Sequence, residues 1–128
     1  MTGYVGYVRV STTEQSQEGV SLDMQRTKIL AYAQLNDLNL VDVIEDAGIS
    51  AKNISGRPGF QRALDMILCG KADGLIVWKL DRAFRSTQDA LAVAEKLNKQ
   101  GKALISICEK LDTSSAIGEF FYSLIMPN

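Results

Sequence analysis

Residues 58–80, "PGFQRALDMILCGKADGLIVWKL", decide the fold. Their first half places apolar residues at the i, i+3, i+4, i+7, i+8 spacing of one helical face, at Phe60, Ala63, Leu64, Ile67 and Leu68. Pro58 suits the first turn of a helix and Gly70 suits its end, so the pattern predicts a helix over 58–69. The mostly apolar run 74–80 is typical of a strand buried on both faces of a sheet.

Strand and helix patterns alternate along the rest of the chain. Strands are predicted over 3–10, 40–46, 74–80 and 103–109, and helices over about 22–35, 58–69 and 87–99, with a last helix starting near Ser115. Ser21 is a candidate N-cap, and Ser86 with Asp89 has capping-box spacing. The helix residues predicted to face inward are Leu22, Ile29, Tyr32, Ala33, Ala90, Val93, Ala94 and Leu97. This alternation predicts an α/β fold with a largely parallel central sheet and helices on both faces.

The composition excludes several classes of protein. The 128 residues fit one domain, and a hydrophobic content of 46% is enough to form a core. The net charge of −1 argues against binding of nucleic acid through a generally basic surface, but it is compatible with a local arginine cluster. No membrane span or secretory signal is visible. Cys69 and Cys108 are interpreted as core thiols, and a reducing, cytoplasmic setting is the expectation.

Polar residues follow the predicted strands at the edge where parallel strands end. Ser11 comes directly after the first strand, and Arg9 shares its face if the strand continues that far. Asp81 and Arg82 follow the third strand, and Arg57 ends the long loop after the second. Functional loops of parallel sheets gather at this edge, so we expect these residues at one rim.

Arginines near a serine suit phosphate chemistry. The chain has no histidine, which excludes the usual Ser-His-Asp hydrolase and histidine-ligated zinc. Guanidinium groups pair with phosphate oxygens, and Arg82 and Arg85 are one turn apart if that segment is helical. Such a cluster would stabilise a phosphoryl transition state and lower the cost of forming an alkoxide at Ser11.

Each of these residues also has a simpler interpretation. Ser11 is alternatively a turn residue at the strand end, and Arg9 a solvated strand residue. Arg57 is alternatively an exposed loop residue, and Asp81 an ion-pair partner of Arg82.

Four segments in order resemble the serine recombinase family of resolvases, invertases and large serine integrases. They are "YVRVSTTEQ" (7–15), "DAGISAKNISGRPGFQRAL" (46–64), "VWKLDRAFRS" (77–86) and "LDTSSAIGEFFYSLI" (111–125). The resemblance implies that Ser11 attacks a phosphodiester of double-stranded DNA, forming a 5′-phosphoserine bond and releasing a 3′-hydroxyl. It also implies an arginine set at the site, Arg9, Arg57, Arg82 and Arg85. Three further residues match positions that support the site, Asp81, Gln15 and Gln25.

The resemblance also implies no metal, no cofactor, and a homo-oligomer in which a tetramer cuts both duplexes before its subunits rotate and the ends rejoin. The loop 16–21 is longer than in small resolvases and looks more like that of large integrases. The family continues through a long helix into a DNA-binding domain, so residues 1–128 are expected to be a catalytic domain truncated in or before that helix. A bacterial, phage or mobile-element origin is the expectation.

The last segment is predicted to be an association surface. Its helical stripe would consist of Ile117, Phe120, Phe121, Leu124 and Ile125. Two other function classes stay open at this point. One is a receiver-like phosphate-binding domain, which would use Asp81 but lacks an acidic pair after the first strand. The other is an association module that joins full-length partners.

Overall fold

The computed structural model describes residues 3–10, 21–47, 58–84 and 86–113, apart from the side chains of residues 10, 47, 82 and 87. Its elements, in order, are β1 (Gly3–Val10), α2 (Leu22–Leu35), β2 (Asn39–Ala47), α3 (Pro58–Leu68), β3 (Gly74–Val77), α4 (Leu80–Ala83), α5 (Thr87–Lys99), β4 (Ala103–Ser106) and β5 (Leu111–Asp112). The loop was predicted over 47–57, but Ala47 is the last residue of β2. The rest of that loop and the predicted last helix lie outside the described residues.

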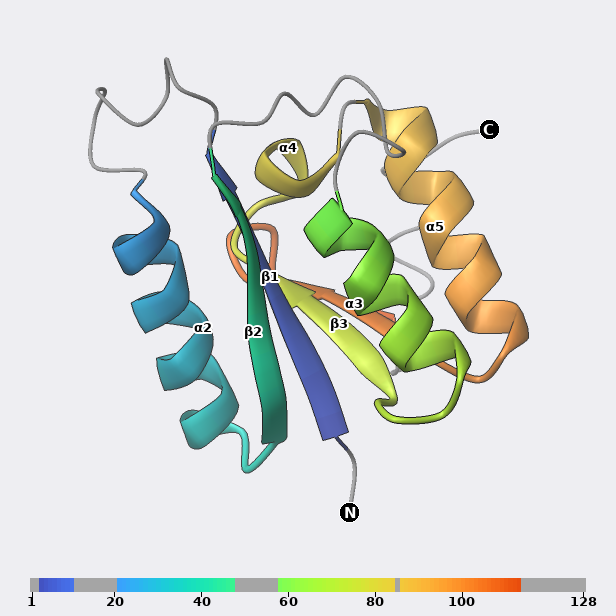
Figure 1. Cartoon of the computed structure of the whole chain (residues 1–128), viewed down its shortest axis with the longest axis horizontal. Coiled ribbons are helices and arrows are strands. Elements are labelled where there is room, and N and C mark those ends of the chain that lie inside the picture. The colour runs from blue at the N-terminus through green and yellow to red at the C-terminus, as the bar shows by residue number, and fades with distance from the viewer. Residues whose placement is uncertain (1–2, 11–20, 48–57, 85, 114–128) are drawn as a thin grey trace.

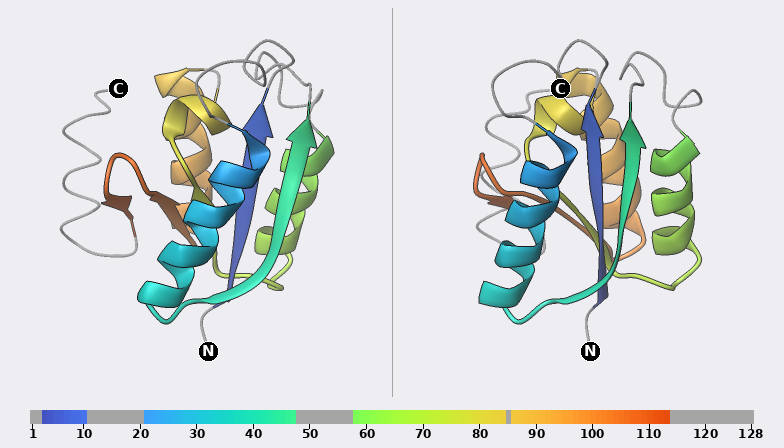
Figure 2. Two further views of the ribbon diagram at one scale, coloured as in Figure 1. Left: turned by 90° about the vertical axis from the view of Figure 1, so that its left-hand side faces the viewer. Right: turned by 60° about the vertical axis from the view of Figure 1, so that its left-hand side comes forward.

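The sheet has the strand order β2-β1-β3-β4-β5. β1 pairs in parallel with β2 and β3, β3 pairs in parallel with β4, and only β5 runs antiparallel to its neighbour. Helix α2 covers one face of the sheet, and α3 and α5 cover the other (Figures 1 and 2). The predicted α/β fold with a largely parallel sheet between helices is therefore confirmed.

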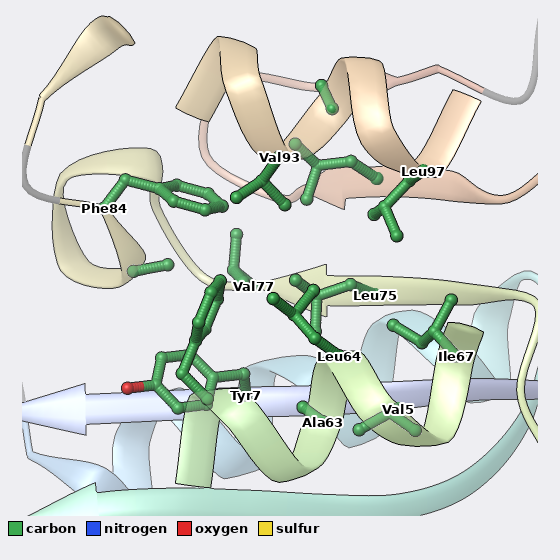
Figure 3. Packing of buried hydrophobic residues seen from close by; sticks show 14 of the residues in the cluster. Val5, Tyr7, Ala63, Leu64, Ile67, Leu75, Val77, Phe84, Val93 and Leu97 are labelled. Carbon is green, nitrogen blue, oxygen red and sulfur yellow. The ribbon is translucent and has the colours of Figure 1, made fainter. Parts of the chain in front are cut away.

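Two hydrophobic clusters fill the spaces between the sheet and its helices. Because side chains alternate along a strand, Val5 and Tyr7 enter the cluster beneath α3 and α5, which Figure 3 shows. Tyr4 and Val8 enter the opposite cluster, where Ile29 of α2 is fully buried. All four residues of β3 are buried, as the apolar run predicts for a central strand.

The helix boundaries follow the capping residues of the sequence. The Ser21 hydroxyl accepts from the Met24 N–H at 3.1 Å, and the Ser86 hydroxyl accepts from the Asp89 N–H at 3.2 Å. Both predicted N-caps are therefore confirmed. Gly70 follows α3 at a φ of 93°, which a residue with a side chain rarely adopts.

Two predicted strands are shorter in the structure. β3 ends at Val77, and the apolar residues beyond it lead into the single-turn helix α4. β4 ends at Ser106, after which a turn over 107–110 reverses the chain into β5. Short apolar runs have the same composition in strands, turns and one-turn helices, so periodicity did not separate them.

The prediction that both cysteines are core thiols is wrong, because both are exposed free thiols. Cys69 follows the last residue of α3 and is off the buried stripe of that helix. Cys108 lies in the turn after β4 rather than in a strand.

Candidate active site at the carboxyl ends of the strands

The carboxyl ends of β1, β2 and β3 lie at one edge of the sheet, together with α4 and the first turns of α3 and α5 (Figure 1). Arg9, Gln25 and Asp81 are described there with their side chains, and Arg82 with its backbone. The other predicted site residues lie outside the described residues, namely Ser11, Gln15, Arg57 and Arg85.

Arg9 is the penultimate residue of β1 and is only 4% exposed. The alternative that it is a solvated strand residue is therefore wrong. Strand alternation places it on the same face as Val5 and Tyr7, which is the face covered by α3 and α5. Burying a guanidinium group is costly, so Arg9 does not serve to solubilise the strand end.

Gln25 holds the end of β1 through both groups of its side-chain amide. Its nitrogen donates to the Arg9 carbonyl at 3.0 Å, and its oxygen accepts from the Arg9 N–H at 3.4 Å. The pairing of β1 with β3 ends at Tyr7 and Val77, two residues before Arg9. The buried side-chain amide of Gln25 therefore bonds to the Arg9 N–H and carbonyl groups, which a longer β3 would otherwise have paired. It thereby fixes the backbone of Arg9, two residues before Ser11 in the sequence.

Asp46, near the end of β2, is a buried carboxylate that the sequence analysis missed. It is 3% exposed and accepts from the Gly59 N–H at 2.9 Å and the Phe60 N–H at 3.1 Å. These are N–H groups of the first turn of α3, which an N-cap side chain would normally satisfy. Its second oxygen also accepts from the Tyr7 hydroxyl at 2.8 Å.

The cap of α3 therefore comes from Asp46 of β2 and not from the residue before the helix. In the sequence that preceding residue is Arg57, which has no acceptor to offer. A Cβ atom on Gly59 would lie 2.7 Å from an Asp46 oxygen, so only glycine permits this approach. An arginine in front of a proline-glycine helix start was the available sequence signal that a cap must come from elsewhere.

The backbone around α4 corrects one predicted spacing. The helix ends at Ala83, and Phe84 is extended with φ −126° and ψ 147°. The condition that the segment after Arg82 is helical is therefore not met, because the helix stops one residue after Arg82. Phe84 is buried with its ring edge-on to Phe60, at a centroid distance of 5.7 Å, and this contact ties the end of α4 to the core.

Asp81 is exposed on α4, and the structure gives it an ion pair with Lys79 at 3.8 Å. An exposed pair at this distance contributes little to stability.

Within the described part of the chain, no three histidine, cysteine, aspartate or glutamate side chains are grouped to hold a metal ion. None of the described helices has the length and apolar character to cross a membrane.

Comparisons with known proteins show the family to which the sequence and fold are similar. The family model "Resolvase, N terminal domain" matches residues 4–126. The chain is 39% identical over 121 residues to the DNA-invertase hin of Salmonella typhimurium, covering 94% of this chain and 56% of that protein. It is 33% identical over 121 residues to the serine recombinase gin of Escherichia phage Mu, covering 94% of this chain and 55% of that protein. The chain thus spans about half the length of the curated relatives it matches.

Solved structures agree with the family match. The N-terminal catalytic domain of TP901-1 integrase is 36% identical, with a TM-score of 0.87 over 97% of this chain and 91% of that one. A resolvase family site-specific recombinase from Streptococcus pneumoniae is 34% identical, with a TM-score of 0.78 over 98% of this chain and 85% of that one.

Proposed function

Because the chain belongs to the resolvase family of serine recombinases, we propose that it is the catalytic domain of a protein that cuts and rejoins double-stranded DNA at specific sites. The observation that carries the proposal is the buried Arg9 at the end of β1, held by Gln25 and two residues before Ser11. A cation withdrawn from solvent at this position favours an anionic group at the serine.

In the proposed reaction the Ser11 oxygen attacks the phosphorus of a DNA phosphodiester. The new oxygen–phosphorus bond gives a 5′-phosphoserine, the bond to the 3′-oxygen breaks, and that oxygen takes up a proton as a 3′-hydroxyl while the serine loses its own. Rejoining is the reverse attack by a 3′-hydroxyl. The phosphoserine conserves the phosphodiester energy, so rejoining needs no ATP.

The proposed roles divide the rim residues into two groups. Arg9, Arg57, Arg82 and Arg85 stabilise the charge of the pentavalent phosphorus and of the attacking oxygen. Asp81, Gln15 and Gln25 support the site without bonding to the reacting atoms. The receiver-like alternative is less well supported, because residues 9–11 occupy the place of its acidic pair and the family match does not favour it.

Ser11→Ala tests the proposal in the complete protein that contains this chain. The substrate is a nicked suicide duplex carrying the site that this protein selects from a randomised library. Wild type should form a covalent protein–DNA adduct that maps to Ser11, and the variant should form none. An adduct that persists in Ser11→Ala, or that maps to another residue, would show that the nucleophile is elsewhere.

The proposed partners are double-stranded DNA and further copies of the same protein, in the bacterial cytoplasm of a host carrying the mobile element. The apolar stripe that the sequence predicts, which includes Phe121 and Ile125, supports self-association. Sedimentation velocity over a concentration series should show association by wild type that is lost in the Phe121→Glu, Ile125→Glu variant. A wild-type protein that stays monomeric at every concentration would count against it.

A further inference from the structure

The turn after β4 contacts the start of α4, and the family chemistry assigns no task to this contact. The Glu109 carboxylate accepts from the Leu80 N–H at 3.3 Å with one oxygen. Its other oxygen accepts a short hydrogen bond from the Ser106 hydroxyl. Ser106 is the last residue of β4 and is fully buried, so it fixes the position of the glutamate side chain.

Helix α4 needs such a contact because it has only four residues. A single turn is unstable in isolation, and its first N–H groups have no partner within the helix. The N-cap residue Lys79 makes no side-chain capping bond. Glu109 therefore anchors the start of α4 by accepting from the Leu80 N–H, and the buried side chain of Phe84 anchors its end.

The turn that carries Glu109 is itself fixed to the end of β3. The Ile107 N–H donates to the Val77 carbonyl and the Cys108 N–H donates to the Trp78 carbonyl, both at 3.0 Å. The Lys110 N–H closes the turn onto the Ile107 carbonyl at 3.1 Å. The turn lies beside the segment that joins β3 to α4 (Figure 1). Main-chain and side-chain contacts thus hold the same junction.

We infer that Ser106 and Glu109 are positioning residues, which set the placement of Arg82 by anchoring the first turn of α4. The expected effect on catalysis rests on the proposed function. The anchor, meaning the hydrogen bonds of Glu109 to Leu80 and Ser106, does not depend on it. Displacement of a catalytic group by about 1 Å can slow a reaction about a hundredfold. Losing the anchor should therefore slow DNA cleavage without weakening DNA binding.

The test compares Glu109→Ala with Glu109→Gln in the complete protein that contains this chain. Glutamine keeps the length of the side chain, and its amide can accept from the Leu80 N–H and donate to the Ser106 oxygen. We expect Glu109→Ala to lower the single-turnover rate of adduct formation on the suicide duplex about tenfold to a hundredfold. Glu109→Gln should recover most of that rate, and Ser106→Ala should fall between the two. Glu95→Ala, which changes an exposed glutamate of α5, is the matched control.

A double-mutant cycle separates positioning from a general loss of stability. If Glu109 acts through α4, then Glu109→Ala should cause almost no further loss of the cleavage rate in a protein that already carries Arg82→Ala and Arg85→Ala. Full additivity of the two losses would overturn the inference. Equal losses in Glu109→Ala and Glu109→Gln would overturn it as well.

Hydrogen exchange keeps the anchor testable if the proposed chemistry fails. The amides of residues 80–84 should exchange faster in Glu109→Ala than in wild type, while those of α3 stay unchanged. If Arg82→Ala and Arg85→Ala leave cleavage unaffected, the proposed function is wrong in its arginine roles, and the exchange of α4 still decides the anchor. Unchanged exchange over 80–84 would overturn the anchor.

Discussion

The Tyr7 hydroxyl donates to the Asp46 carboxylate at 2.8 Å, which joins the centre of β1 to the end of β2 beneath the first turn of α3. The same carboxylate accepts from the Gly59 and Phe60 N–H groups. The Tyr7 ring packs edge-on to Phe60, at a centroid distance of 5.1 Å. One buried side chain therefore fixes two strands and a helix next to the candidate site.

Asp46→Ala should destabilise the fold by about 2–4 kcal/mol, because it removes a helix cap and leaves buried donors without this acceptor. Tyr7→Phe should cost about 1 kcal/mol, because Phe60 and Gly59 still donate to the carboxylate. Urea unfolding measures both. Asp65→Asn on the exposed side of α3 is the control and should change stability by less than about 0.5 kcal/mol. Equal stability of Asp46→Ala and wild type would refute the capping role.

Gln25→Ala should loosen the end of β1, because it removes both amide contacts to the Arg9 backbone. We expect faster hydrogen exchange at the Arg9 amide and slower formation of the Ser11 adduct. Gln34→Ala, at an exposed position of the same helix, should change neither quantity. A Gln25→Ala protein that exchanges Arg9 slowly and cleaves at the wild-type rate would remove Gln25 from the site.

Lysine substitutions test the proposed arginine roles. Arg9→Lys, Arg82→Lys and Arg85→Lys keep the charge but lose the planar fork that matches phosphate oxygens. Each should lower the single-turnover cleavage rate by about 10²–10³, as expected for a transition-state donor. Arg62→Lys, on the exposed face of α3, is the control. Losses that merely follow a lowered melting temperature would place these arginines in the scaffold instead.

Periodicity predicted most of the fold because the elements that satisfy it are local. The stripe of α3 and the caps at Ser21 and Ser86 depend on residues within a few positions of each other. Asp46 was missed because it caps a helix that starts twelve residues later in the chain, and no local pattern marks such a contact. The predicted strand over 103–109 likewise concealed the turn that carries Glu109.

The candidate site was predicted from residue types and the family resemblance rather than from geometry. The predicted parallel direction of the strands put the ends of β1 and β3 at one edge, which the structure confirms. Burial of Arg9 could not be predicted, because an arginine at a strand end is equally compatible with solvent. The placement of Ser11 beside the arginines stays a prediction.

Asp73 should make stability depend on pH at the opposite edge of the sheet. One of its oxygens accepts from the Gly3 N–H at 3.0 Å, and the other pairs with Lys102 at 3.5 Å. The Gly3 hydrogen bond first, and then the Lys102 charge, hold the pKa of Asp73 below its usual value of 3.8, although desolvation opposes them. A carboxyl group with a lowered folded-state pKa stabilises the protein above the unfolded value, and this stabilisation is lost as the pH falls through the folded pKa.

Asp73→Asn should therefore lower the melting temperature at neutral pH, while the two proteins should converge at a pH below the folded pKa of Asp73. The shift should be small, because the Lys102 pair is partly exposed and screened by solvent. Thermal unfolding followed by circular dichroism from pH 7 to pH 2 measures both curves. Asp65→Asn, on the exposed side of α3, is the control. A difference between wild type and Asp73→Asn that stays constant over this whole range would show that the charge of Asp73 does not contribute, since only an ionised carboxylate responds to pH in this way.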